Sequence, residues 1–114
     1  MNVSEQITEL SDKWYRLISS DHHKDRDCHW YVETAYSYGN PPVYTAYING
    51  YLFSDQGEDR KSYEMAELDL LNMTKEAIKD RKKHADYILA QDNYDQFDVI
   101  EANRFYEIFP ELKI

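Results

Sequence analysis

The chain is poor in the residues that support several specialised structures and chemistries. It has one cysteine, Cys28, so no disulfide forms within it, and a reducing compartment, the cytoplasm, is expected. With three scattered glycines and three prolines it contains neither a glycine-rich phosphate loop nor a low-complexity linker. No apolar run approaches the roughly 20 residues of a membrane span, and the N-terminus lacks the apolar segment of a signal peptide.

Positive charge is scarce as well. There are 13 Lys and Arg against 22 Asp and Glu, which gives a formal net charge of −9. Nucleic acids and anionic membranes are bound through clustered basic residues, so we expect neither as a partner. The one basic cluster, at 79–83, is short and fits the end of a helix or a solvated helix face. The acidic surface favours solubility or a basic protein partner.

The chain does carry clear periodic patterns. Its length of 114 residues predicts one domain, 1–114, with a modest core. Three antiparallel strands are expected, at about 28–38, 43–48 and 51–55, and helices on either side of them. Asn49-Gly50 predicts a two-residue hairpin turn, which would set Ile48 opposite Tyr51 and Ala46 opposite Phe53. The predicted fold class is α+β, a three-stranded antiparallel meander packed with helices in the order α-β-β-β-α-α.

Alternation along the strands assigns residues to the two faces of the sheet. The face expected to meet the core carries Trp30, Val32, Thr34, Tyr36, Tyr38, Tyr44, Ala46 and Ile48. A connection at 39–43 would align Tyr38 with Tyr44. If helices cover that face, the other one displays Tyr31, Tyr47 and Leu52 beside His29 and Glu33. Tyrosine is common both in sheets and in binding surfaces, so a partner-binding role is a hypothesis here.

Three helices are predicted from apolar spacing. They span about 4–19, capped by Ser4, then 62–91, capped by Ser62, and 99–108, ending before Pro110 with a capping box from Asp98 to Glu101. The middle helix has an apolar stripe of Ala66, Leu70, Met73, Ala77, Ile78, Ala85, Ile88 and Leu89. At about 45 Å it exceeds such a small domain, so it either breaks near 79–84 or overhangs the sheet. An overhang needs cover, which self-association could supply.

The last helix and its approach are both apolar and acidic. The apolar residues Val99, Ile100, Phe105, Tyr106, Ile108 and Phe109 are expected to dock on the rest of the protein. Residues 86–114 hold seven acidic and two basic residues, a local charge of −5. The partner-binding candidates in this region are Asp92, Asp95, Asp98 and Glu101.

No constellation for catalysis or for a cofactor emerges. His22, His23, Cys28 and His29 are the best candidate metal ligands, but their spacing departs from that of zinc sites. Cys28 and His29 would also point to opposite faces of a strand, which weakens a cysteine–histidine pair. No carboxylate is placed by the pattern in an apolar pocket, where its pKa would suit acid–base work. We therefore expect no enzyme activity, no cofactor and no resident metal.

The helix–meander–helix order resembles double-stranded-RNA-binding domains in topology, but the basic residues of that family are missing. The sequence favours a small acidic cytoplasmic protein-interaction module, adaptor-like or inhibitor-like. The alternatives are a structural protein that dimerises through the 62–91 helix and, third, a metal-binding protein. A small-molecule pocket would leave little trace in the sequence, so that alternative also stays open.

Overall fold

The computed structural model describes residues 1–18, 28–50 and 54–113. Its elements are α1 (Val3–Ile18), β1 (Cys28–Ala35), β2 (Val43–Gly50), β3 (Ser54–Gln56), α2 (Tyr63–Leu89), α3 (Gln96–Ile108) and the 3₁₀ turn η1 (Pro110–Leu112). The expected α+β fold and the order α-β-β-β-α-α are confirmed. None of the described helices combines the length and the apolar character needed to cross a membrane.

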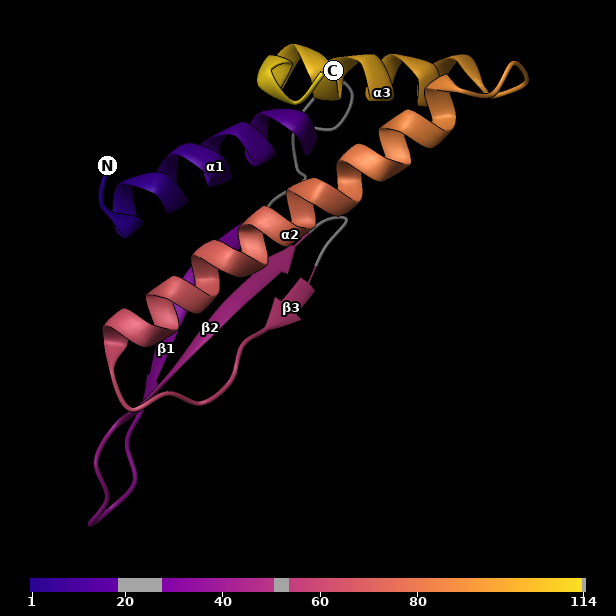
Figure 1. Cartoon of the computed structure of the whole chain (residues 1–114). Coiled ribbons are helices and arrows are strands. Elements are labelled where there is room, and N and C mark those ends of the chain that lie inside the picture. Colours follow the sequence, from indigo (N-terminus) through magenta and orange to yellow (C-terminus); the bar gives the residue numbers. More distant parts are fainter. Residues whose placement is uncertain (19–27, 51–53, 114) are drawn as a thin grey trace.

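The three strands form one antiparallel sheet in the order β1-β2-β3. Helix α2 crosses one face of this sheet and contacts both β1 and β2, while none of the described helices lies on the opposite face (Figure 1). Trp30 pairs with Ile48 and Val32 pairs with Ala46. These pairs lie on the covered side, where Ile48 and Ala46 are buried. The expected division of the strands into a core face and an open face is therefore confirmed from Cys28 to Thr34.

The predicted register between the first two strands is wrong by four residues. Tyr44 lies opposite Thr34, where Tyr38 was expected, because β1 ends at Ala35 and the connection spans 36–42. Gly39, with φ of 78°, forms a turn in which the amide of Asn40 donates to the carbonyl of Ser37 at 3.0 Å. A shift by an even number of residues keeps each side chain on its face, so the face assignment survives the register error.

The predicted Asn49-Gly50 turn is also wrong. Both residues belong to β2, where Asn49 lies opposite His29 and Gly50 opposite Cys28. On the other side of β2, Ile48 lies opposite Asp55 of β3, where Tyr51 was expected. Pairing along the whole of β1 outweighs the local turn preference of Asn-Gly. Residues 51–53, which were assigned to the third strand, lie outside the described residues.

The chain continues along β2 after β3 ends. The amide of Gly57 donates to the carbonyl of Ala46 at 2.8 Å, and Arg60 forms an antiparallel bridge with Tyr44. Arg60 also holds Asp69 of α2 through two hydrogen bonds, of 2.7 and 3.1 Å. This pair fixes the edge of the sheet to the helix that covers it.

The helix caps agree with the sequence in one case of three. Ser62 caps α2, with its hydroxyl accepting a hydrogen bond from the amide of Met65 at 3.2 Å. Asn2, in place of Ser4, accepts from the amide of Glu5 at 2.8 Å at the start of α1. Asp95, in place of Asp98, accepts from the amide of Phe97 at 2.8 Å, so α3 begins three residues earlier than predicted.

Helix α2 is continuous through 79–84, so of the two predicted alternatives, a break or an overhang, the overhang is the one that occurs. At 27 residues it is about 40 Å long in a molecule of 59 × 29 × 21 Å. Its N-terminal half covers the sheet, and its C-terminal half runs beyond the sheet and packs against α3 (Figure 1). Leu71 and Thr74 join the predicted apolar stripe in the interior, whereas Leu89 is exposed.

The overhanging half of α2 is thus covered by the chain itself. The core runs through α1, α2, α3 and the sheet and consists of Ile7, Trp14, Leu17, Ile18, Cys28, Ala46, Ile48, Leu70, Leu71, Ala77, Ile78, Ala85, Ile88, Ala102, Phe105, Tyr106, Ile108 and Phe109. The prediction that α3 docks is confirmed for most of its apolar residues, but Ile100 remains exposed.

Candidate binding surfaces

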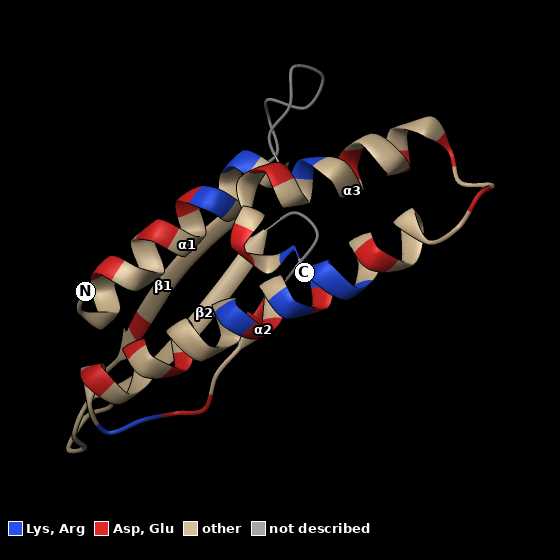
Figure 2. Ribbon diagram, turned by 45° about the horizontal axis from the view of Figure 1, so that its top comes forward, with Lys and Arg blue, Asp and Glu red and all other residues tan. Residues whose placement is uncertain are grey.

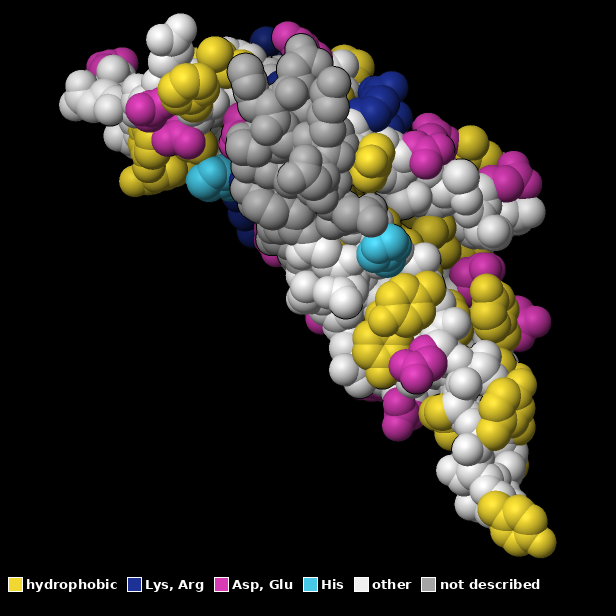
Figure 3. All heavy atoms as spheres, turned by 180° about the vertical axis from the view of Figure 1, so that it is seen from behind, with side chains coloured by type: hydrophobic (Ala, Val, Ile, Leu, Met, Phe, Trp, Pro, Cys, Tyr) yellow, Lys and Arg dark blue, Asp and Glu magenta, His cyan; other side chains and the backbone are white. Residues whose placement is uncertain are grey.

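The uncovered side of the sheet, here called the tyrosine face, is built around two tyrosines from neighbouring strands. Tyr31 of β1 lies opposite Tyr47 of β2, and their rings stack with centroids 5.3 Å apart and planes 16° from parallel. Tyr31 is 42% exposed and Tyr47 is half-buried. Hydrophobic side chains gather over this side of the molecule with acidic groups and histidine among them (Figure 3). Leu52, the third residue predicted here, lies outside the described residues.

Acidic groups border the tyrosine pair. Burial, the negative charge of Glu33 and a hydrogen bond to Glu33 raise the pKa of Tyr47 above its ordinary value of 10.0. Two residues before Tyr47 on β2, the hydroxyl of Thr45 donates to Asp59 at 2.7 Å, and Thr45 is buried. The phenol of Tyr47 therefore stays neutral at physiological pH, in a surface with local negative charge.

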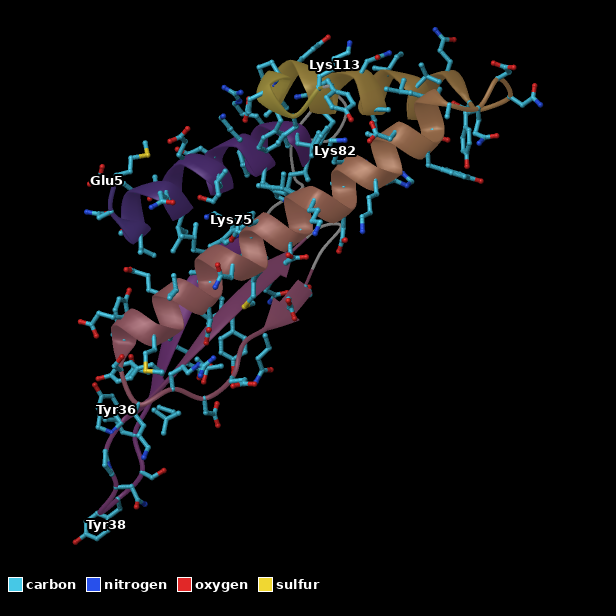
Figure 4. The ribbon with its side chains drawn as sticks, in the orientation of Figure 1. Glu5, Tyr36, Tyr38, Lys75, Lys82 and Lys113 are labelled. Carbon is cyan, nitrogen blue, oxygen red and sulfur yellow. The ribbon has the colours of Figure 1, made fainter. Side chains whose placement is uncertain are left out.

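Two further tyrosines lie at the tip of the β1–β2 hairpin. Tyr36 and Tyr38 were assigned to the core face by alternation, but they follow the end of β1 and are exposed. They project from the narrow end of the molecule, away from the helices (Figure 4). Their exposure could have been predicted from the turn-forming segment 39–42. Residues next to a turn are often outside the paired part of a strand, even where the apolar alternation continues.

The acidic residues predicted to bind a partner lie at the α2–α3 junction, here called the acidic end (Figure 2). Asp92, Asp95 and Glu101 are exposed and Asp98 is half-buried. Two of the four have structural partners: Asp95 caps α3, and Glu101 faces Arg81 of α2 at 3.6 Å. The sheet that carries the tyrosine face lies along the N-terminal half of α2, whereas the acidic end lies beyond the C-terminal end of α2 (Figure 1). The two predicted surfaces are therefore not brought together.

Exposed apolar groups accompany the acids, and sequence reasoning missed them. Phe97 is 75% exposed in the first turn of α3, and Ile100 follows it three residues later on the same side. Tyr87 and Tyr94 meet edge to face nearby, with centroids 5.8 Å apart. A helical wheel of 96–108 would have placed Phe97 and Ile100 away from Ala102, Phe105 and Tyr106, the residues that are buried.

The candidate metal ligands do not come together among the described residues. Cys28 is buried on the covered face while its neighbour His29 is exposed on the other, as strand alternation predicted. Residues 22 and 23, the two other candidate histidines, lie outside the described residues. Within residues 1–18, 28–50 and 54–113, no three Cys, His, Asp or Glu side chains are placed to hold a metal ion together.

Comparison of the chain with models of protein families, with curated proteins and with solved structures gave no match in any of the three.

Proposed function

We propose that this protein is a small acidic protein-interaction module of the cytoplasm, adaptor-like or inhibitor-like, without catalytic activity of its own. The observation that carries the proposal is a sheet that the described helices cover on one side only, with the stacked pair of Tyr31 and Tyr47 on the other side. The cytoplasmic assignment rests on the single cysteine, which is buried and leaves the chain no internal disulfide.

The composition of the tyrosine face suits a protein partner. Tyrosine rings supply large contact area at low cost in side-chain entropy, and tyrosines are enriched in protein interfaces. The exposed side chains of Tyr36 and Tyr38 add aromatic surface beyond the end of the sheet. Glu33 and Asp59 border the face, so the complementary surface would be apolar with basic groups at its rim.

The acidic end is a second candidate surface for the same function. The specific observation in its favour is that Phe97 and Ile100 are exposed between acidic side chains. An apolar group that is ringed by charge can serve as the central anchor of an interface. A basic partner with an apolar pocket would match it, and binding there would weaken steeply with salt.

Self-association remains the alternative function, but the structural reason for expecting it is weaker. It was predicted because an overhanging α2 needs cover, and Phe105, Tyr106 and Ile108 of α3 supply this cover within the chain. A dimer would therefore need another surface. Light scattering at high micromolar concentration that gives the mass of a monomer would eliminate this alternative.

Site-specific photocrosslinking tests the proposed function. A benzophenone amino acid would replace Tyr31, Phe97 or Tyr15 in turn, and crosslinked products from a lysate of the natural source would be identified by mass spectrometry. Tyr15 on α1 is the control, because at 44% it is as exposed as Tyr31 but lies on another element. We expect one dominant adduct from position 31. Equal labelling at all three positions would contradict the tyrosine face as an interface.

A further inference from the structure

A groove opens on the helical side of the molecule, away from the tyrosine face. It lies between α1, α2 and η1 and has a volume of about 280 Å³. Its apolar lining, among the described residues, consists of Leu10, Ile78, Phe109 and Leu112. Ile78 and Phe109 are buried at its base, while Leu10 and Leu112 are half-buried at its sides. The groove thus joins an apolar base to a surface that is accessible to solvent.

One wall of the groove is basic, in a chain whose net charge is −9. Lys75, Lys79 and Lys82 follow one another at intervals of four and three residues on α2, and all three line the groove. Lys75 and Lys82 lie on the side of α2 that faces α1 and the C-terminal segment (Figure 4). Lys13 of α1 lies near the same groove, with its ammonium 5.5 Å from the ring centroid of Phe109.

Two of the three lysines on this wall are not paired with a carboxylate in the part of the chain that the structure describes. Lys75 and Lys79 have no carboxylate partner among the described residues, whereas Lys82 is paired with Asp86 at 2.8 Å. Glu111, the acidic residue among the described ones that line the groove, is itself paired with Lys13 at 3.5 Å. Lysines spaced four apart on a helix repel one another, so a bound anion would relieve an unfavourable arrangement.

We propose that this groove binds a single-chain amphipathic carboxylate of the fatty-acid class. Its alkyl chain would lie on Ile78 and Phe109, and its carboxylate would be held by Lys75 and Lys79. The size favours this occupant over a partner helix, because the volume is close to the lower bound of small-molecule pockets. A docked helix would need a longer groove with successive anchor sites along it.

Calorimetric titration with dodecanoate, kept below its micelle-forming concentration, tests the proposal on the intact chain. We expect saturable binding of one molecule per chain. The Lys75→Glu/Lys79→Glu variant should bind at least about tenfold more weakly, because charged contacts of this kind contribute more than one factor of ten in affinity. Lys83→Glu is the matched control, since Lys83 is exposed on the same helix and does not line the groove.

A second ligand separates a charge-selective site from general apolar adhesion. Dodecyltrimethylammonium has the same tail and the opposite charge, so it should bind at least about tenfold more weakly than dodecanoate. The proposal is overturned if dodecanoate shows no saturable binding up to its solubility limit. It is equally overturned if both ligands bind alike, or if Lys75→Glu/Lys79→Glu binds as the unchanged protein does. Far-ultraviolet circular dichroism confirms that each variant is folded.

Discussion

At the scale of single residues, the most informative contact is a hydrogen-bond relay between the sheet and α2. The indole nitrogen of Trp30 donates to the hydroxyl of Thr74 at 3.0 Å, and that hydroxyl donates to the carbonyl of Leu70 at 2.7 Å. Thr74 is buried among apolar groups, so its hydroxyl is tolerated because both bonds are made. Its burial could not be predicted from the apolar stripe, since the stripe was read from apolar residues alone.

Replacing Thr74 by Val should destabilise the fold. The change keeps the shape of the side chain but leaves the indole donor of Trp30 without its acceptor. We expect a loss of about 1–2 kcal/mol in the free energy of unfolding, measured by urea denaturation. Thr8→Val is the control, because Thr8 makes the same kind of bond to Ser4 on an exposed helix face. Its effect should stay within about 0.5 kcal/mol, and equal losses would contradict the relay.

A second residue-scale feature joins Lys82, Asp86 and Tyr106. The ammonium of Lys82 lies 2.8 Å from one oxygen of Asp86, and the hydroxyl of Tyr106 donates to the other. These hydrogen bonds, the one from Lys82 foremost, lower the pKa of Asp86 below its ordinary value of 3.8. Burial and the bond to Asp86 raise the pKa of Tyr106. The carboxylate is therefore favoured in the folded state.

The lowered pKa of Asp86 predicts a pH dependence. Its contribution to stability is fully present above the ordinary value of 3.8 and is lost as pH falls through the lower folded value. Between about pH 5 and pH 2, the free energy of unfolding should fall more steeply for the unchanged protein than for Asp86→Asn. Asp80→Asn on the same helix should follow the unchanged protein. Parallel curves for all three would contradict the network.

At the scale of elements, the sequence predicted which face of the sheet a residue occupies better than it predicted where a strand or helix begins and ends. Strand alternation placed Trp30 and Ile48 on the covered side, because an even shift in register does not change the face of a residue. The turn at Asn49-Gly50 was wrong, since pairing with β1 is a long-range interaction that local turn preference does not contain. Capping failed similarly at α3, where Asp95 and Asp98 both fit a cap by residue type.

The cap of α3 can be tested by three substitutions. Asp95→Ala should lower the free energy of unfolding by about 1 kcal/mol, because it leaves the amide of Phe97 without its acceptor. Asp95→Asn should be nearly neutral, since asparagine caps equally well. Asp98→Ala should cost less than Asp95→Ala, because it loses only the favourable interaction with the helix dipole. A larger loss for Asp98→Ala would restore the capping box predicted from sequence.

At the scale of the whole molecule, α3 makes a long helix compatible with a small protein. Phe105 is fully buried and packs on Phe109 with ring centroids 5.0 Å apart. Trp14 and Leu17 of α1 belong to the same core cluster. The sequence predicted an overhang of α2 as one of two alternatives but not the segment that covers it. The spacing of apolar residues in α3 shows which side of α3 is buried but not which element it packs against.

Truncating Phe105 should therefore destabilise the whole protein. Phe105→Ala creates a cavity in the core and should cost about 3–5 kcal/mol in the free energy of unfolding. Phe97→Ala is the matched control on the same helix, because Phe97 is exposed, and its cost should stay within about 0.5 kcal/mol. Thermal or urea unfolding measures both. Similar costs for the two variants would contradict the assigned docking face of α3.

The candidate binding residues were only partly accessible to sequence reasoning. The position of Tyr31 and Tyr47 on the uncovered face was predicted from strand alternation, because odd-numbered residues of both strands lie on the side of the sheet opposite to α2. Tyr36 and Tyr38 were misplaced, since the end of β1 is set by pairing and not by the apolar pattern. The lysine-lined groove was missed, because it is assembled from α1, α2 and η1, which are distant in sequence.

The most direct test of the central claim is the affinity of Tyr31→Ala for the partner that crosslinking identifies, measured with purified proteins beside Tyr15→Ala. If the tyrosine face is the interface, Tyr31→Ala should weaken binding by about tenfold or more, as interface anchors do, and Tyr15→Ala by less than about twofold. Unchanged affinity for Tyr31→Ala, with a loss for Asp95→Asn/Asp98→Asn that shrinks as salt rises, would contradict the tyrosine face and assign binding to the acidic end.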